Sequence, residues 1–150
     1  MGSQSGSARV DEGTTSPSDP RALRLLFLED DDDFQQVLRV LISRVSASHP
    51  VESVFMSTIS DAERVVDATR IDAIVSDYHL PDGNGVEFLE HARRKAPRSQ
   101  RVMLTGHPDV ARTAESFDRS VHRLWDKRLQ PKELQSRIEH MVREMITPAA

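Results

Sequence analysis

The sequence predicts an α/β domain, a doubly wound, five-stranded parallel sheet with helices on both faces. Short continuous apolar runs alternate with segments whose apolar residues recur at helical spacing, and this alternation repeats five times. Strict alternation is typical of a parallel sheet, because each return to a parallel strand needs a crossover helix. A chain of 150 residues is long enough for one such domain and too short for two.

Five apolar runs are predicted to be strands. The first, Leu25–Leu28, ends abruptly at acidic residues, as expected of a strand that is buried on both faces. The fifth run is interrupted by two basic residues. In chain order the runs span residues 25–28, 51–56, 71–76, 102–104 and 121–125. With the strand order 2-1-3-4-5 they form the sheet of a flavodoxin-like fold.

Each strand is followed by a segment with one apolar helical face. Ser60 is a suitable N-cap for the second helix, and Pro108 and Pro131 suit the first turns of the fourth and fifth. Asp32 and Asp33 begin the first helix, where negative charge favours the helix dipole. The apolar faces comprise residues 34, 37, 38, 41, 42 and 45; 62, 65 and 66; 86, 89 and 92; 110, 111, 114 and 117; and 134, 138, 141, 142 and 145.

Composition excludes several classes of protein. With 20 Lys+Arg and 24 Asp+Glu the net charge is −4, so direct nucleic-acid binding is not expected. The chain contains no cysteine, which excludes disulfides, thiolate zinc sites and cysteine nucleophiles. No apolar run approaches the roughly 18–20 residues that span a bilayer, and the N-terminus lacks the apolar core of a signal peptide. We therefore expect a soluble, cytoplasmic domain without membrane contact.

The ends of the chain depart from the alternating pattern. Residues 1–21 are predicted to be a disordered tail, because twelve of the first twenty residues are Gly, Ser, Thr or Pro. Such a segment buries too little apolar surface to offset its ordering entropy. Residues 22–147 are the expected globular domain, and residues 148–150 form a short C-terminal end.

Polar residues that could bind a ligand or take part in a reaction lie at the carboxyl ends of the predicted strands. Glu29 and Asp30 follow the first strand, and Asp77 follows the third. Thr105 ends the fourth strand, and Lys127 comes just after the fifth. In an open parallel sheet, ligands bind outside the carboxyl ends of the strands where the strand order reverses, here between strands one and three. These five side chains are therefore expected to converge.

The residue types in this cluster are suited to holding a metal ion and a phosphoryl group. Three carboxylates at one end of a sheet repel each other unless a cation neutralises them, and Mg²⁺ prefers such oxygen ligands together with water and phosphate. A lysine and a threonine hydroxyl can both bind a phosphoryl group. The turn at residues 81–85 and Gly106 provide the glycines for tight backbone approach beside the cluster.

Four segments of the chain resemble the receiver domain of bacterial two-component response regulators. They are LLFLEDDDDF, IVSDYHLPDGNGVEFL, VMLTGHPD and LWDKRLQPKEL, and the likeness extends over roughly residues 22–147. The resemblance implies that Asp77 is the phosphoacceptor. It also implies that Thr105 and Lys127 contact the phosphoryl group once it is bound.

The same resemblance implies a Mg²⁺ cofactor, held by Glu29, Asp30, Asp77 and the main-chain carbonyl of His79. The chain is then expected to be a single-domain response regulator of a phosphorelay, which modifies itself and is not an enzyme. It would accept the phosphoryl group from a histidine kinase or a phosphotransfer protein. Output would be made through a downstream protein target, by a monomer or a phosphorylation-dependent dimer.

Two positions depart from the receiver pattern. Arg128 follows Lys127 where the family has a proline, so a cis peptide bond is not expected there. Leu124 occupies the position of a switching aromatic residue, with Trp125 beside it. These departures put the usual switching movement of the aromatic side chain in doubt. All five predicted site residues are present: Glu29, Asp30, Asp77, Thr105 and Lys127.

Two alternative functions remain open on the sequence. One is a degenerate receiver that binds partners without phosphorylation. The other is a Mg²⁺-dependent aspartyl phosphohydrolase of the haloacid dehalogenase kind, which needs a second aspartate where this chain has His79. His79 and His107 are either surface loop residues or residues that flank the mouth of the site and tune the access of water.

Overall fold

The structure, a computed structural model, describes residues 9–10 and 22–146 of the chain. The expected tail therefore lies outside the described residues except for residues 9 and 10, and the expected C-terminal end lies outside them entirely. No helix in the part described is long and apolar enough to cross a membrane.

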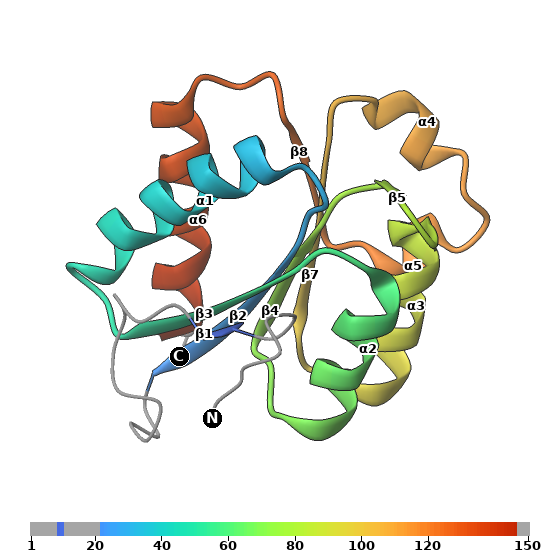
Figure 1. The fold of residues 1–150 in the computed structure, drawn as a ribbon, viewed down its shortest axis with the longest axis horizontal. Coiled ribbons are helices and arrows are strands. Elements are labelled where there is room, and N and C mark those ends of the chain that lie inside the picture. Colours follow the sequence, from blue (N-terminus) through green and yellow to red (C-terminus); the bar gives the residue numbers. More distant parts are fainter. Residues whose placement is uncertain (1–8, 11–21, 147–150) are drawn as a thin grey trace.

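The predicted alternation of strands and helices is present (Figure 1). The main sheet contains β1 (Arg9–Val10), β2 (Leu23–Leu28), β3 (Val51–Met56), β4 (Ala73–Ser76), β7 (Gln100–Thr105) and β8 (Arg123–Asp126), and a separate short hairpin contains β5 (His79–Leu80) and β6 (Gly83–Asn84). The helices are α1 (Asp32–Ser46), α2 (Ile59–Ala68), α3 (Gly85–Lys95), α4 (Pro108–Arg112), α5 (Phe117–Ser120) and α6 (Pro131–Ile146).

The strand order confirms the predicted topology. The main sheet runs β1-β3-β2-β4-β7-β8. Its five parallel strands lie in the order β3-β2-β4-β7-β8, which is the predicted order 2-1-3-4-5. The order reverses between β2 and β4, so a crevice for ligands is expected outside their carboxyl ends.

A sixth strand, β1, was not predicted. Its two residues belong to the segment expected to be a disordered tail, yet they pair antiparallel with Val54 and Phe55. The physical reason is that β3 would otherwise be an edge strand with unpaired backbone groups, which any extended segment nearby can satisfy.

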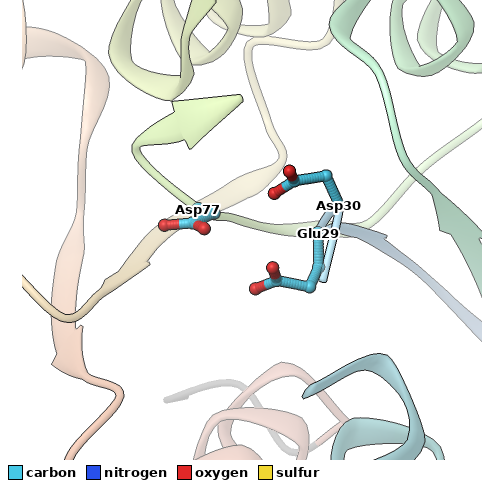
Figure 2. Close-up of side chains that lie close together, drawn as sticks. All are labelled: Glu29, Asp30 and Asp77. Atoms are coloured by element: carbon cyan, nitrogen blue, oxygen red, sulfur yellow. The ribbon is translucent and has the colours of Figure 1, made fainter. Parts of the chain in front are cut away.

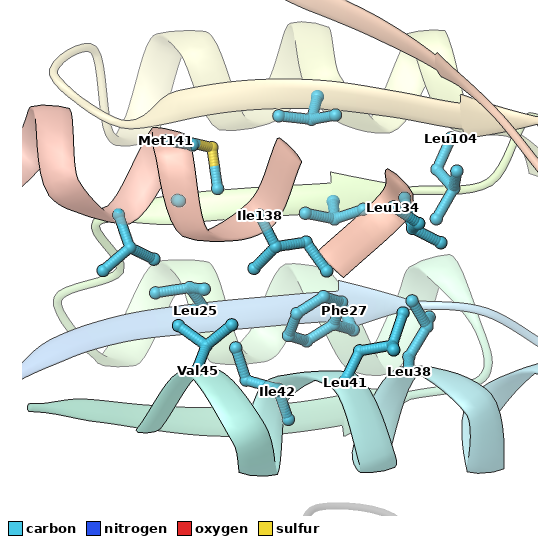
Figure 3. Packing of buried hydrophobic residues seen from close by; sticks show 14 of the residues in the cluster. Leu25, Phe27, Leu38, Leu41, Ile42, Val45, Leu104, Leu134, Ile138 and Met141 are labelled. Atoms are coloured by element: carbon cyan, nitrogen blue, oxygen red, sulfur yellow. The ribbon is translucent and has the colours of Figure 1, made fainter. Parts of the chain in front are cut away.

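Two layers of helices bury the two faces of the sheet (Figure 1). Helices α1 and α6 cover one face, and their apolar side chains join those of the strands in the first core cluster, part of which is drawn in Figure 3. Within it the rings of Phe27 and Phe55 stack with centroids 4.8 Å apart. The second core cluster lies on the opposite face, under α2, α3 and the segment from α4 to α5.

Side-chain caps fix where the first helices begin. Asp31 caps α1 by accepting hydrogen bonds from the backbone N–H groups of Asp33 and Phe34. Asp32 and Asp33 occupy the first turn of α1, as predicted for residues that favour the helix dipole. The cap of α2 is Thr58 and not Ser60, because Thr58 Oγ1 accepts from Asp61 N–H while Ser60 already lies inside the helix.

The fourth predicted helix is broken into α4 and α5. The apolar spacing of residues 110 to 117 suggested one continuous helix, but α4 ends at Arg112. Thr113 Oγ1 donates a 2.6 Å hydrogen bond to the carbonyl of Val110, and this local bond competes with continued helical pairing. The fifth strand is also displaced: Val121 caps the end of α5, so β8 begins at Arg123.

Candidate functional site

The sheet brings the predicted site residues together at one edge. Asp77 N–H donates to the carbonyl of Leu28 at 2.9 Å, and Glu29 N–H donates to the carbonyl of Met56 at 3.0 Å. These bonds continue the parallel pairing past the strand ends and so fix where the two acidic loops begin. Figure 2 shows the side chains of Glu29, Asp30 and Asp77 gathered in the same small space.

The three carboxylates form a potential cation site. Glu29, Asp30 and Asp77 each offer one oxygen, and these oxygens lie within 4.8 Å of one another. Glu29 is 2% exposed and Asp77 is 9% exposed, while Asp30 faces solvent. Hard oxygen donors with one open side suit Mg²⁺, which keeps several of its waters. The residues present therefore fit the predicted cofactor.

Glu29 is buried and strongly held. Its Oε2 accepts a 3.0 Å hydrogen bond from Asp31 N–H, and its Oε1 lies 2.6 Å from Lys127 Nζ. Burial raises the pKa of Glu29, and the hydrogen bonds from Lys127 and Asp31 only partly oppose this. A second positive charge at the site would therefore favour the ionised carboxylate.

Lys127 bridges the two buried carboxylates. Its Nζ lies 2.6 Å from Glu29 Oε1 and donates to Asp77 Oδ2 at 2.9 Å. Burial alone lowers the pKa of Lys127, but the hydrogen bonds with Glu29 and Asp77 outweigh it, so the pKa is raised. The ammonium is thus held in its charged form beside Asp77.

The carboxylate of Asp77 is fixed at both oxygens. Oδ1 accepts a 2.6 Å hydrogen bond from Tyr78 N–H, and Oδ2 accepts from Lys127. The backbone behind it is packed against Gly85, where an added Cβ would lie 1.9 Å from the carbonyl oxygen of Asp77. Only glycine permits this approach.

The turn that follows Asp77 is hydrogen-bonded to the start of α2, a contact that the sequence did not indicate. Asp82 accepts hydrogen bonds of 2.9 and 3.0 Å from the backbone N–H groups of Ile59 and Ser60, at the start of α2. These bonds lower the pKa of Asp82. Gly83 in the same turn has φ +151°, a backbone conformation that side chains disfavour.

Thr105 and Gly106 occupy the end of β7. Thr105 is buried, and its Oγ1 accepts a 3.0 Å hydrogen bond from His107 N–H, while its carbonyl accepts from Lys127 N–H. The expectation that Gly106 allows a close backbone approach is wrong, since a Cβ there would meet nothing within 4 Å. The chain leaves the sheet into open space at this position.

Two exposed histidines lie beside each other near the site. The rings of His79 and His107 are 5.7 Å apart between centroids, in an edge-to-face arrangement. They come from the loops that follow Asp77 and Thr105, and this placement fits both expectations, that of surface loop residues and that of residues flanking the mouth of the site. The role of the main-chain carbonyl of His79 as a metal ligand stays a prediction.

Leu124 and Trp125, where the chain departs from the receiver pattern, lie on opposite faces of the sheet. Leu124 pairs with Met103 and packs into the second core cluster. Trp125 pairs with Leu104 and belongs to the first, under α6. Arg128 forms an ion pair with Asp126 at 2.6 Å, and the described residues contain no cis peptide bond.

Two residues in the first turns of α1 contribute contacts that the sequence did not indicate. Gln35 is buried, and its Nε2 donates to the carbonyl of Glu29 at 2.5 Å and to Ser57 Oγ at 3.3 Å. The ring of Phe34, expected only as part of the core, faces Lys127 Nζ at 4.7 Å from its centroid. A polar side chain on the inner side of an amphipathic helix was the available signal for Gln35.

Fold and site together define an open α/β domain with an aspartate, a lysine and an acidic pair at its topological switch point. Residues 25–139 match the family of the response regulator receiver domain, and the chain belongs to that family.

The chain is also similar in sequence to two curated regulatory proteins. The chain is 30% identical over 88 residues to the photosynthetic apparatus regulatory protein RegA of Rhodobacter capsulatus, covering 59% of this chain and 46% of that protein. It is 26% identical over 131 residues to the phosphate regulon transcriptional regulatory protein PhoB of Escherichia coli, covering 86% of this chain and 55% of that protein. The chain thus spans about half the length of these relatives.

Among solved structures, a CheY-like receiver domain protein from Methanospirillum hungatei has a TM-score of 0.70 at 21% identity, covering 85% of this chain and 99% of that chain. The non-phosphorylated HemR receiver domain from Leptospira biflexa has a TM-score of 0.70 at 24% identity, covering 85% and 97%. Both confirm the fold.

Proposed function

We propose that this receiver domain accepts a phosphoryl group on Asp77 and thereby switches its contacts with another protein. The observation that carries this proposal is the position of Lys127, whose ammonium bridges Asp77 and Glu29 beside a third carboxylate. A carboxylate with a fixed cation at one oxygen is arranged to receive a phosphoryl group, because the developing charge is met by groups already in place.

In the proposed reaction an Asp77 oxygen attacks the phosphorus of a phosphohistidine. A P–O bond forms, the P–N bond breaks, and the electron pair of that bond stays on the imidazole nitrogen, which then takes a proton. Glu29, Asp30 and Asp77 would hold Mg²⁺, which would supply positive charge near the transferred oxygens. Lys127 donates to one phosphoryl oxygen, and the hydroxyl of Thr105, which is buried at the end of β7, would donate to another. The product is an acyl phosphate that stays attached to Asp77.

The charge and chemistry of the site support particular partners. The donor is a histidine kinase or a phosphotransfer protein, and the output is contact with a downstream protein target, in a monomer or a phosphorylation-dependent dimer. Direct nucleic-acid binding is not part of the proposal, because the chain has a net charge of −4. Such a phosphorelay operates in the cytoplasm.

Incubation with acetyl phosphate and Mg²⁺, followed by intact mass measurement, tests the proposal. We expect the mass to rise by one phosphoryl group, only when Mg²⁺ is present, and not in the matched variant Asp77→Asn. Steady release of inorganic phosphate without a modified chain would instead indicate the phosphohydrolase. No change in mass under any condition would indicate the degenerate receiver.

A further inference from the structure

We infer that Phe34 is a positioning residue for Lys127. The aromatic ring of Phe34 holds the ammonium of Lys127 beside Asp77 when a metal ion is bound at Glu29. This inference rests on the proposed function. It starts from the ring face of Phe34, which lies 4.7 Å from Lys127 Nζ. A cation at this distance from an aromatic face is attracted by the ring quadrupole.

The other contacts of the ammonium explain why the ring matters. Lys127 Nζ is held by Glu29 Oε1 at 2.6 Å and by Asp77 Oδ2 at 2.9 Å. Both carboxylates also belong to the three-oxygen cation site. A metal ion bound there would draw electron density from both carboxylates and so weaken their attraction for the Lys127 ammonium. The Phe34 ring has no lone pair that a hard cation would take, so its contact with the ammonium persists.

The ring is fixed relative to the site by its own helix. Phe34 packs against the first core cluster, and its backbone N–H is bonded to the capping carboxylate of Asp31 at 3.4 Å. Its neighbour Gln35 donates to the carbonyl of Glu29 at 2.5 Å. The beginning of α1 therefore reaches both parts of the site: Gln35 holds the acidic loop, and Phe34 faces the ammonium.

The partial burial of Lys127 strengthens this contact. Its side chain is 19% exposed, so water screens the ammonium less than at an open surface. Leucine in place of Phe34 would keep an apolar wall and remove the quadrupole, whereas tyrosine would keep the aromatic face. These two substitutions separate the electrostatic contribution of the ring from its packing.

The test measures the rate of phosphorylation by acetyl phosphate at saturating Mg²⁺. We expect Phe34→Leu to slow the reaction about 3- to 10-fold, the range that corresponds to a partly desolvated cation–π contact. Phe34→Tyr should stay within about twofold of the unchanged chain. Thermal unfolding of both variants gives the folded fraction by which each rate is corrected.

The same substitution in a chain that lacks the Lys127 ammonium shows whether the Phe34 ring acts through it. In the Lys127→Met chain, adding Phe34→Leu should leave the remaining rate unchanged, because the cation that the ring contacts is gone. An equal slowing in both backgrounds, or equal rates for Phe34→Leu and the unchanged chain, would overturn the inference. If the unchanged chain is not phosphorylated at all, the proposed function itself fails, which is a different result.

Discussion

Gly85 lies so close to Asp77 that a Cβ at Gly85 would be 1.9 Å from the carbonyl oxygen of Asp77 and 2.8 Å from Ser76 Oγ. The N–H of Gly85 also donates to the carbonyl of Tyr78 at 2.8 Å. The start of α3 and the loop that carries Asp77 are therefore packed backbone against backbone. The nearest atom belongs to the backbone, so it cannot move aside as the end of a flexible side chain could.

The first prediction concerns this close contact. Gly85→Ala should destabilise the fold by at least about 2 kcal/mol, because the backbone of Asp77 must shift to admit the methyl group. Gly106→Ala is the matched control, since a Cβ at Gly106 meets nothing within 4 Å, and should change stability by no more than about 0.5 kcal/mol. Urea denaturation measures both. Similar values for the two variants would show that Gly85 is not constrained as described.

A second prediction addresses the acidic pair. Asp30→Ala should weaken Mg²⁺ binding by at least about tenfold, because the loss of even an indirect metal contact commonly costs 10- to 100-fold. Without metal the variant should be slightly more stable, since repulsion between Asp30 and the two buried carboxylates is removed. Titration with Mg²⁺, followed by the fluorescence of Trp125, measures the affinity.

The control for this titration is Asp32→Ala, which removes an exposed carboxylate from the first turn of α1 and lies outside the three-oxygen cluster. Its Mg²⁺ affinity should match that of the unchanged chain. Equal weakening in both variants would mean that general negative charge attracts the ion, and that Asp30 is no ligand.

A third prediction gives a pH dependence to the contact between α3 and α5. Glu90 Oε1 accepts a 2.6 Å hydrogen bond from Ser120 Oγ, and Glu90 Oε2 lies 2.9 Å from the guanidinium of Arg93. The hydrogen bonds from Arg93 and then Ser120 lower the pKa of Glu90 to about 2. A carboxyl with a lowered pKa stabilises the fold above its unfolded value of 4.5, and this contribution is lost as the pH falls through about 2.

The variant Glu90→Gln should therefore be less stable than the unchanged chain at pH 7, and the difference should shrink between pH 4.5 and pH 2. Urea midpoints at several pH values measure this directly. A difference between the two chains that is constant from pH 7 to pH 2 would contradict the ionic role of Glu90.

A fourth prediction concerns how the signal leaves the site. Leu124 shares a sheet face with Met103 and, by the alternation of side chains along β7, with Thr105, whereas Trp125 lies on the opposite face. Leucine cannot rotate a ring into space vacated by Thr105, and Trp125 is on the wrong face to replace it. We therefore expect weak coupling, with a resting state that is already partly active-like.

Backbone amide shifts of residues 107–130, with and without beryllofluoride as a phosphoryl mimic, measure this coupling. The changes should be small in the unchanged chain and larger in Leu124→Tyr. The shifts of residues 77–85 serve as the control that the mimic has bound. Large, all-or-none changes throughout residues 107–130 of the unchanged chain would contradict weak coupling.

The sheet and the site could be predicted because both depend on local patterns. Continuous apolar runs such as Leu25–Leu28 allow little besides a buried strand, and in a parallel sheet the residues that follow such strands must meet at one edge. The convergence of Glu29, Asp77 and Lys127 follows from that topology alone.

The features that escaped prediction depend on contacts between distant segments or on single hydrogen bonds. The pairing of Arg9–Val10 with β3 joins segments far apart in sequence and involves only two residues. The break between α4 and α5 accompanies the side-chain bond of Thr113, which apolar spacing does not report. The bonds from Asp82 to the start of α2 likewise have no local sequence signal.

Chemical trapping can show whether Asp77 is the residue that carries the phosphoryl group. Reduction of the acetyl phosphate-treated chain with borohydride converts an aspartyl phosphate into homoserine, which peptide mapping can locate. We expect homoserine at position 77, dependent on Mg²⁺ and reduced after Lys127→Met under the same brief exposure. Homoserine at Asp30 or any other acidic residue, or none at all in a chain that has gained phosphoryl mass, would contradict it.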